Sequence, residues 1–255
     1  MTTNPLTIDA ITLEPSMWSA LNTGIVGRAH REKLWNLKTW QLRDFSDKPD
    51  GRIDDKPYGG NPGMVITYPP LQRALESIHE YRKSSSFVIL PDPAGERLTQ
   101  PMLQELSQKQ HLTFVCGRYE GIDERFCRNH VDLRVSVGPY VVSAGDLPAM
   151  TMIDGIVRLL PGALGNMQSA PADSFQDWLV DHPCYTRPQV YQEQKVPEVL
   201  LQGNHQKIGK WERKHRLART LQTHPERFIG QQLSKEDISM LRSHFIQSQD
   251  DNTSG

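Results

Sequence analysis

The chain has 255 residues, a formal net charge of −1 and 37% hydrophobic residues, which is typical of a soluble globular protein with one or two domains. No apolar run approaches the ~20 residues that span a bilayer, and the N-terminus lacks the basic and apolar segments of a secretory signal. These features argue against a membrane protein and predict a cytoplasmic one. The three cysteines lack CxxC spacing, which argues against a disulfide framework and a structural zinc site.

The N-terminal part of the chain predicts two strands and a glycine-rich loop. Residues 7–13 alternate between apolar and polar types, and Trp35 to Phe45 is a weaker strand candidate. The polar stretch 43–55 indicates a loop, which leads into KPYGGNPGMVI. The glycines of this run suit either a nest of backbone amides that binds an anion or a plain turn before a strand at 64–68. Both interpretations stay open.

Strands and helices then alternate along the chain. An apolar stripe at helical spacing predicts a helix over Leu71–Arg82, and the run SSFVIL predicts a strand buried on both faces. A helix at Gln100–Gln110 and a second buried strand, LTFVC, repeat the pattern. Strand, helix and strand in this order predict an α/β fold with a parallel sheet.

Two loops follow the ends of these buried strands, at Pro91–Gly95 and Gly117–Gly121. Ligands of parallel sheets bind at the carboxyl ends of the strands, so we expect both loops to converge on one site. Seven glycines separate short apolar runs between Cys116 and Gly165, as expected where the backbone approaches a ligand closely. Within this stretch LRVSVG and YVVSAG predict further strands. The pattern indicates a small-molecule site built from loops.

The segment after YVVSAG predicts a helix with two apolar faces. Asp146 is expected to be its N-cap, with Pro148 in the first turn. One face carries Leu147, Met150, Ile153, Val157 and Leu160, and the other carries Met152, Ile156 and Leu159. A helix covered on two sides is either a central core helix or part of a subunit interface, and the sequence favours neither.

The C-terminal part differs in composition from the rest. The run Ala163–Ala172 is small, polar and proline-bearing, which is typical of a linker. Beyond it, His205–Arg219 contains six Lys or Arg and one Glu, a local charge of +5 in a chain of net charge −1. Such a helix face is either solvated surface or a phosphate-binding patch. Ser234 and Asp237 predict a capping box for a last helix.

Several common catalytic motifs are absent from the sequence. It contains no GxGxxG placed between a strand and a helix and no GxxxxGK[ST], so dinucleotide and P-loop sites lack support. It also contains neither GxSxG nor HExxH. The nine histidines show no ligand spacing, so no metal site is predicted. What remains is a glycine-lined pocket and a separate basic segment.

An ordered set of motifs resembles one known family. These motifs are DDKPYGGNPGMV, CGRYEGIDERF, VGPYVVSAGDLPAM, IDGIVRLLPGALG, YTRP, VPEVLLQGNH and WERKHRLART. Together they are similar to the bacterial tRNA (guanine-N1)-methyltransferase family over almost the whole chain. The resemblance implies a SPOUT-type α/β domain with a deep trefoil knot at 1–162, a linker at 163–174 and a small all-helical tRNA-binding domain at 175–255. It also implies a homodimer whose active site lies at the subunit interface.

The resemblance also implies a cofactor and a substrate. S-adenosyl-L-methionine is expected to bind in the knot and to methylate N1 of the guanosine immediately 3′ of the anticodon in tRNA. Backbone amides and carbonyls of glycine-rich loops can form hydrogen bonds with the adenine and ribose of S-adenosyl-L-methionine. The matching cofactor positions are Leu90, Pro91, Gly95, Gly117, Tyr119, Glu120, Val137, Gly138, Pro139, Tyr140, Val141, Val142 and Gly145.

Methylation of guanine N1 makes a chemical demand that the family positions meet. N1 carries a proton at neutral pH, so a base must remove it before the nitrogen attacks the sulfonium methyl group. The resemblance assigns that base to Asp173 and assigns stabilisation of the charge at O6 to Arg158. Considered without the family, the residues favour structural roles instead, with Asp173 as an N-cap before SFQDWL and Arg158 as an ion-pair partner. Mg2+ is compatible with this reaction as an additional cofactor, but the sequence contains no ligand motif that indicates a Mg2+ site.

The predicted tRNA contacts lie mostly in the basic segment, where they would grip phosphates near the anticodon stem. The residues are Asp54, Asn204, His205, Lys210, Arg213, Lys214 and Arg219.

The chain departs from the usual family pattern at several positions. The family usually has glycine at Asn61, Ser-Pro-Gln-Gly at 92–95, aspartate at Pro139, glycine at Ala144 and glutamate at Asp146. Asp92 and Ala94 change the polarity of the cofactor loop, Pro139 removes an amide, and Ala144 adds a Cβ where glycine would allow positive φ. The alternative to an active methyltransferase is therefore a non-catalytic or altered-specificity RNA-binding relative.

Overall fold

The computed structural model describes residues 4–164 and 174–252. The chain forms two compact units, Met1–Met167 and Gln168–Gly255, and each is described here by itself. The predicted linker at 163–174 falls almost entirely outside the described residues. No described helix is both long and apolar enough to cross a membrane.

The first unit is built on a five-stranded parallel sheet in the order β2-β1-β6-β5-β7. Its strands are β1 (Leu6–Thr12), β2 (Trp35–Gln41), β5 (Phe87–Arg97), β6 (His111–Val115) and β7 (Leu133–Ser136). In the registers, Ile11 lies opposite Val115 and Ile89 opposite Phe114. The predicted parallel α/β sheet is therefore confirmed.

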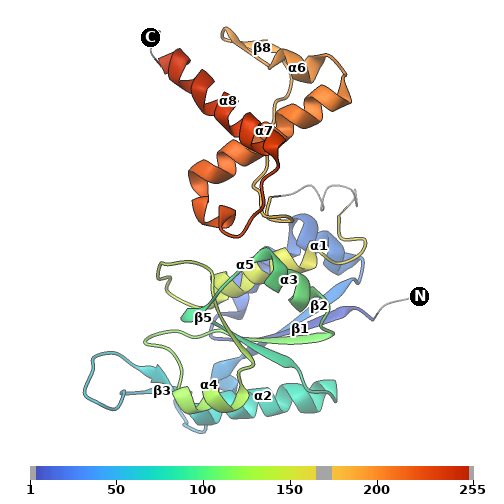
Figure 1. The fold of residues 1–255 in the computed structure, drawn as a ribbon. Helices are drawn as coiled ribbons and strands as arrows, with labels where there is room; N and C mark the ends of the chain where they lie inside the picture. The colour runs from blue at the N-terminus through green and yellow to red at the C-terminus, as the bar shows by residue number, and fades with distance from the viewer. Residues whose placement is uncertain (1–3, 165–173, 253–255) are drawn as a thin grey trace. The chain divides into compact units, whose positions relative to one another are not determined.

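Helices cover both faces of this sheet (Figure 1). One face carries η1 (Pro15–Asn22), α1 (Gly24–Arg31), α3 (Gln100–Ser107) and α5 (Asp146–Val157). The other carries α2 (Tyr68–Arg82) and α4 (Glu124–His130). Apolar side chains therefore form two clusters, one on each side of the sheet, as expected of strands buried on both faces.

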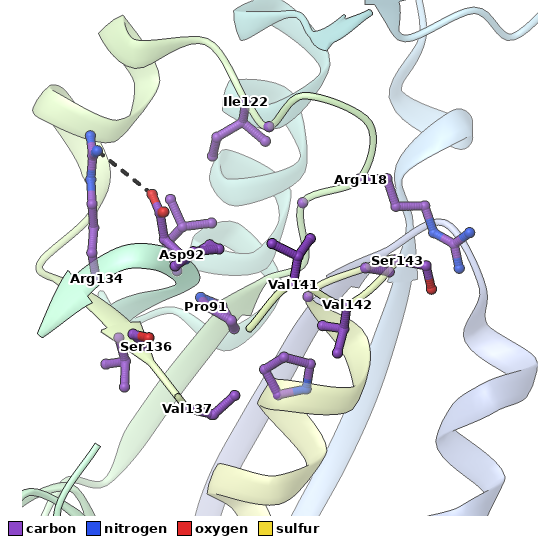
Figure 2. Close-up of a pocket in the computed structure, with 18 of the residues that line it drawn as sticks. Pro91, Asp92, Arg118, Ile122, Arg134, Ser136, Val137, Val141, Val142 and Ser143 are labelled. Atoms are coloured by element: carbon purple, nitrogen blue, oxygen red, sulfur yellow. Dashed lines mark ion pairs between the residues drawn. The ribbon is translucent and has the colours of Figure 1, made fainter. Parts of the chain in front are cut away.

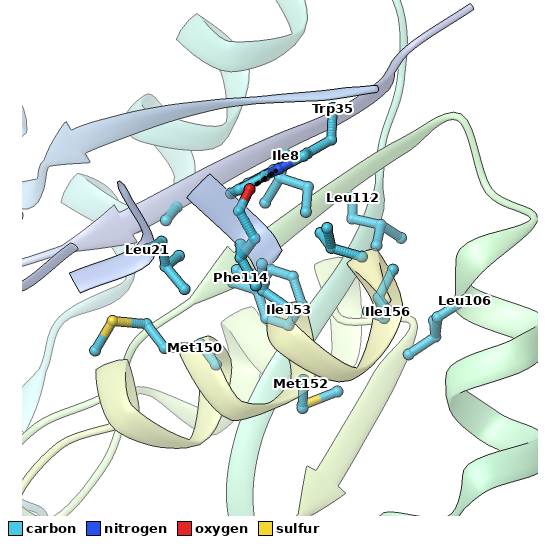
Figure 3. Close-up of a cluster of buried hydrophobic side chains, with 14 of the residues drawn as sticks. Ile8, Leu21, Trp35, Leu106, Leu112, Phe114, Met150, Met152, Ile153 and Ile156 are labelled. Atoms are coloured by element: carbon cyan, nitrogen blue, oxygen red, sulfur yellow. Dashed lines mark hydrogen bonds between the residues drawn. The ribbon is translucent and has the colours of Figure 1, made fainter. Parts of the chain in front are cut away.

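The helix α5 is the centre of the larger cluster. Its side chains Ile153 and Ile156 are fully buried and lie against Ile8, Leu112 and Phe114 of the strands (Figure 3). Full burial of one such side chain stabilises the fold by roughly 1.5–3 kcal/mol. Within one chain α5 is thus a core helix, one of the two alternatives that its sequence left open.

Two predicted elements differ from the structure near the loops. Residues 91–97 were expected to be a loop, but β5 continues to Arg97, with a register shift against β7 between Pro91 and Glu96. The run YVVSAG was expected to be a strand, but residues 140–145 form a loop in which Val141 is 85% exposed. No sheet edge of the described unit accepts this run, so its β-forming residues stay unpaired.

The strand expected at 64–68 is much shorter than predicted. Only β4 (Val65–Ile66) forms, and it pairs in antiparallel fashion with β3 (Asp54–Asp55). Tyr68 already begins α2, because Pro69 and Pro70 are tolerated in the first turn of a helix. The strand predicted at Trp35–Phe45 likewise ends at Gln41, and the short helix η2 (Leu42–Phe45) follows.

A buried charged cluster ties β1 to its neighbours. Asp9 is fully buried and accepts hydrogen bonds from Trp40 Nε1 at 2.7 Å, Arg82 Nε at 3.0 Å and Arg82 Nη2 at 3.1 Å. His111 Nε2 lies 2.8 Å from Asp9 Oδ2. Burial alone would raise the pKa of the Asp9 carboxyl, but the bonds with His111, Arg82 and Trp40 outweigh it and lower that pKa.

The second unit combines helices with a short hairpin. It contains α6 (Glu198–Leu201), α7 (His205–Thr223), η4 (Pro225–Phe228), α8 (Lys235–Asn252) and the strands β8 (Val190–Tyr191) and β9 (Gln194–Lys195). The hairpin makes the expectation of an all-helical domain wrong. The predicted capping box is confirmed, since Ser234 Oγ accepts from Asp237 N at 3.0 Å and Asp237 Oδ2 accepts from Ser234 N at 3.3 Å.

Candidate functional site

A cavity of about 450 Å³ lies at the carboxyl ends of β5, β6 and β7. Its walls are formed by residues 90–93 of β5 and by the segments 117–122 and 136–145, and Pro148 of α5 contributes as well. This volume is within the range of small-molecule sites. The two segments predicted to converge both reach the cavity, although Pro91–Gly95 continues β5 instead of forming a loop.

Eleven of the thirteen predicted cofactor positions line this cavity. They are Leu90, Pro91, Gly117, Tyr119, Glu120, Val137, Gly138, Tyr140, Val141, Val142 and Gly145. Gly95 and Pro139 do not line it. A Cβ on Gly95 would stand only 2.4 Å from Arg134 C and Val135 N, so this glycine lets two backbone segments pack together.

The cavity loops are joined to one another through their backbones. Gly145 N donates to Gly117 O at 2.8 Å, and Arg118 forms an antiparallel bridge with Ala144. Ala144 is absent from the residues with positive φ, so its extra Cβ brings no backbone strain. Tyr119, by contrast, has φ +59. Left-handed backbone at a non-glycine residue is strained and is typical of functional loops.

One side of the cavity carries an ion-pair network (Figure 2). Arg134 Nη2 lies 2.7 Å from Glu124 Oε2, and Arg134 Nη1 lies 3.7 Å from Asp92 Oδ2. Asp92 Oδ1 also accepts from Ala94 N at 2.8 Å, which fixes the turn of the loop. Hydrogen bonds from Arg134 and then Arg128 lower the pKa of Glu124. The acidic side chain at 92 is therefore balanced within the chain.

The other side of the cavity holds Arg118 and Ser143 (Figure 2), with Asp146 buried behind them. Asp146 was predicted to be an N-cap, but Gly145 takes that position. Asp146 Oδ1 instead accepts hydrogen bonds from Thr12 Oγ1 and, at 3.0 Å, from Trp18 Nε1. The side chain turns into the core because β1 and η1 offer it two donors there.

Arg118 is a cavity residue that our sequence reasoning missed. Its Nη2 lies 4.0 Å from Asp146 Oδ2 and 3.8 Å from Met17 Sδ. Its Nε and Asp146 Oδ2 are buried and have no hydrogen-bond partner among the described residues. A usable signal was present, since a charged residue that directly follows the end of a buried strand falls at the ligand-binding edge.

The two thiols near the cavity are not activated. Cys127 lines the cavity, and burial raises its pKa to about 11. Burial, and then the charge of Asp146, raise the pKa of Cys116 well above its ordinary value. Because thiolates are the reactive form, neither side chain is suited to nucleophilic catalysis at neutral pH.

The two predicted catalytic residues lie away from this cavity or beyond the described structure. Arg158 is half-buried and forms the C-cap of α5, whose N-terminal end adjoins the cavity. At 1.5 Å per residue, α5 places it about 18 Å from Asp146. Arg158 does not line the cavity. Asp173 falls in the gap at 165–173, outside the described residues.

The predicted substrate position Asp54 lies in β3, next to a cavity loop but not on the cavity wall. Its partner strand β4 is joined to that loop, since Ile66 N donates to Gly121 O at 3.0 Å. Glu120 N also donates to Met64 O at 3.0 Å. A Cβ on Gly63 would stand 2.5 Å from the Glu120 side chain, so the β3–β4 loop packs closely against the cavity rim.

The predicted contacts in α7 divide into two groups. Asn204 and Arg213 have structural partners, since Asn204 Oδ1 caps the helix by accepting from Lys207 N at 3.1 Å. Arg213 forms two bonds with Asp237, at 3.0 and 3.2 Å, which lower the pKa of that carboxyl. Lys210 pairs with Glu236 at 2.9 Å but is exposed, as are His205 and Arg219, and Lys214 is half-buried.

The whole chain was compared with known proteins. A family model described as tRNA (Guanine-1)-methyltransferase TrmD matches residues 6–229. The chain belongs to this family.

Curated relatives that carry the name tRNA (guanine-N(1)-)-methyltransferase agree with the family model. The protein of Pseudomonas putida strain W619 is 44% identical over 247 residues, 96% of this chain and 98% of its own. That of Chromobacterium violaceum is 46% identical over 248 residues, covering 95% and 97%. That of Hydrogenovibrio crunogenus is 46% identical over 223 residues, covering 87% and 94%. Membership in this methyltransferase family implies a methyl donor.

Proposed function

We propose that this protein transfers a methyl group from S-adenosyl-L-methionine to N1 of the guanosine immediately 3′ of the anticodon in tRNA. The observation that carries the proposal is the convergence of two family motifs, CGRYEGIDERF and VGPYVVSAGDLPAM, on one cavity at the carboxyl-end edge of the sheet. Because the proposed substrate is tRNA, we expect the enzyme to work in the cytoplasm.

The cavity fits the proposed cofactor. Its volume of about 450 Å³ suits a nucleoside that bears an amino acid, and its walls alternate apolar side chains with backbone amides and carbonyls. Leu90, Val137 and Val142 would contact the adenine, and the backbone at Gly117 and Gly138 would take part in hydrogen bonds with the sugar and base. The bound cofactor would supply an electrophilic sulfonium methyl group.

We further propose that this part of the chain forms the deep trefoil knot of a SPOUT domain. The knot is supported by two glycines, Gly95 and Gly145, at which backbone segments pack closely against one another. A Cβ on Gly95 would meet the Arg134–Val135 backbone at 2.4 Å, and one on Gly145 would meet Gly117 N at 3.1 Å. A threaded chain needs such close crossings, and glycine allows them.

The proposed chemistry rests on two side chains. Asp173 would accept the N1 proton, which leaves negative charge on the base as the nitrogen attacks the methyl group. Arg158 would stabilise that charge at O6. Neither step requires either residue to touch the cofactor before the guanine enters.

We propose that the active site combines two copies of the chain. Arg158 lies about 15 Å along α5 from Pro148, the helix residue that lines the cavity, so a second copy can bring it to a given cavity more readily than the same chain. An apolar patch made of Tyr140 and Val141 of the cavity wall and Leu147 of α5 supports an interface there, since these side chains are 58%, 85% and 50% exposed. A homodimer would cover this patch and bring the two parts together.

We propose that the exposed cations of α7 bind tRNA phosphates. Arg213 is less suited to this role, because its guanidinium is already paired with Asp237. Lys207 lies exposed on the first turn of the same helix and offers a matched comparison.

We expect Lys207→Ala and Arg213→Ala to have different effects. Lys207→Ala should weaken tRNA binding and lower the slope of log affinity against log salt by about 1, without changing the melting temperature. Arg213→Ala should lower the free energy of unfolding by about 1 kcal/mol, because it leaves Asp237 without its partner. Filter binding at several salt concentrations and thermal melts would measure both. Equal losses of stability would contradict the assignment.

The proposed function is tested by methyl transfer to a tRNA transcript with guanosine 3′ of the anticodon. The expected product is N1-methylguanosine at that position, and a transcript with adenosine there should stay unmethylated. Absence of product at micromolar enzyme would reject the proposal. If tRNA then still bound, the non-catalytic RNA-binding alternative would be supported instead.

A further inference from the structure

We propose that Arg118 binds an oxyanion at its end of the cavity, the carboxylate of the methyl donor, and that the buried Asp146 positions it. This inference rests on the proposed function and assigns a part of that site. Arg118 lines the cavity, whereas Asp146 is fully buried beside it.

The two arginines of the cavity differ in how far they are already paired. Arg134 lies 2.7 Å from Glu124 and 3.7 Å from Asp92, so two carboxylates balance its charge. Among the described residues, the carboxylate oxygen nearest to Arg118 is Asp146 Oδ2, whose 4.0 Å separation from Nη2 is beyond hydrogen-bond distance. A guanidinium has five N–H donors, and Arg118 Nε is buried without a partner among the described residues. Arg118 therefore has donor capacity left for a ligand.

The buried Asp146 is held where it can orient this guanidinium. Its Oδ1 accepts from Trp18 Nε1 at 3.0 Å and from Thr12 Oγ1, so the carboxyl group cannot rotate without losing two bonds. Its Oδ2 is buried and has no hydrogen-bond partner in the part of the chain that the structure describes. The attraction at 4.0 Å draws Arg118 toward the core without using its donors.

The chemistry of the ligand decides which group Arg118 would take. The adenine and ribose of S-adenosylmethionine are uncharged, and the amino-acid part carries its one anionic group, a carboxylate. Arginine binds carboxylates and phosphates through two parallel hydrogen bonds. The same guanidinium could also bind a phosphate oxygen of the tRNA. The carboxylate of the methyl donor and the tRNA phosphate are therefore the two possible sources of the oxyanion. Figure 2 places Arg118 at the opposite side of the cavity from Arg134, as an extended ligand with a charged end requires.

Calorimetry on the full-length protein separates these sources. The probes are S-adenosylhomocysteine, which has the carboxylate, and 5′-methylthioadenosine, which lacks the amino-acid part. Arg118→Gln is expected to weaken S-adenosylhomocysteine binding about 30-fold and methylthioadenosine binding less than about 3-fold. Asp146→Asn keeps an acceptor for Thr12 and Trp18, and we expect it to weaken S-adenosylhomocysteine selectively as well. Arg134→Gln is the matched control and should leave the ratio of the two affinities unchanged.

Each outcome decides the inference. If Arg118→Gln leaves both nucleosides unaffected but weakens tRNA binding and lowers its salt slope, the oxyanion is a phosphate and the carboxylate assignment is wrong. If Arg118→Gln lowered the affinity for both nucleosides equally, Arg118 would have a structural role and the proposal would be overturned. A selective loss of S-adenosylhomocysteine affinity in Arg134→Gln instead of Arg118→Gln would also overturn it. If the unaltered protein bound neither nucleoside, the proposed function itself would fail.

Discussion

Replacing Asp173 with asparagine is expected to lower the rate of methyl transfer by about 1,000-fold and to leave the affinity for S-adenosylmethionine unchanged. The asparagine amide cannot accept the N1 proton, so guanine N1 stays protonated and has no lone pair with which to attack the methyl group. Single-turnover transfer to a tRNA transcript measures the rate, and calorimetry measures the affinity.

A neighbouring acid provides the control for this variant. Asp177 pairs with Arg216 at 2.7 Å and its Oδ1 accepts from Leu179 N, so its role is structural. We expect Asp177→Asn to change the transfer rate by less than about 3-fold. An unchanged rate in Asp173→Asn would reject Asp173 as the base, and a matching loss in both variants would point to a general effect of local charge.

The largest loss of stability is expected from Asp9→Asn. This change removes the charge from a fully buried carboxylate that Arg82, His111 and Trp40 surround, and breaking such a cluster costs about 3 kcal/mol at pH 7. Urea unfolding followed by fluorescence measures the difference. The matched control is Glu80→Gln, an exposed acid on α2, which should change stability by less than about 0.5 kcal/mol.

The same variant carries a pH dependence with a defined sign. The cluster lowers the pKa of Asp9 in the folded protein, so its contribution is fully present above the unfolded pKa of about 3.9 and is lost as the pH falls through the folded value. The stability difference between the two proteins should therefore stay constant from pH 7 to about pH 5 and shrink below about pH 4. A difference that grew on acidification would contradict the role given to Asp9.

The sequence predicted the sheet and the cavity loops because both follow from local pattern. The buried runs around Ile89 and Phe114 can only be inner strands, and the glycines after them mark the ligand edge. The strand predicted for YVVSAG is absent because β-forming residues alone do not make a strand; this run pairs with no strand of the described sheet. Its exposed Val141 belongs to the apolar patch beside the cavity.

The positions of charged groups were harder to predict. Asp146 fits the N-cap pattern perfectly by sequence, but Trp18 and Thr12, more than 120 positions away, offer it stronger partners in the core. Arg118 was overlooked although it follows the end of a buried strand, because its residue type alone does not distinguish an arginine of a binding site from one on the surface. The departure at Asp92 is compensated by Arg134, a contact between two strands that sequence spacing cannot reveal.

The measurement that tests the central claim most directly uses mixed dimers of two inactive variants. Gly117→Leu would fill the cavity, since a Cβ there has only Ile122 Cγ2 nearby at 3.7 Å, and Asp173→Asn removes the base. Purified mixed dimers, carrying one chain of each kind with different affinity tags, contain one site with an intact cavity and an intact base from the other copy. We predict about half the wild-type rate of methyl transfer for them and almost none for either homodimer. Mixed dimers as inactive as the homodimers would contradict an active site built from two copies.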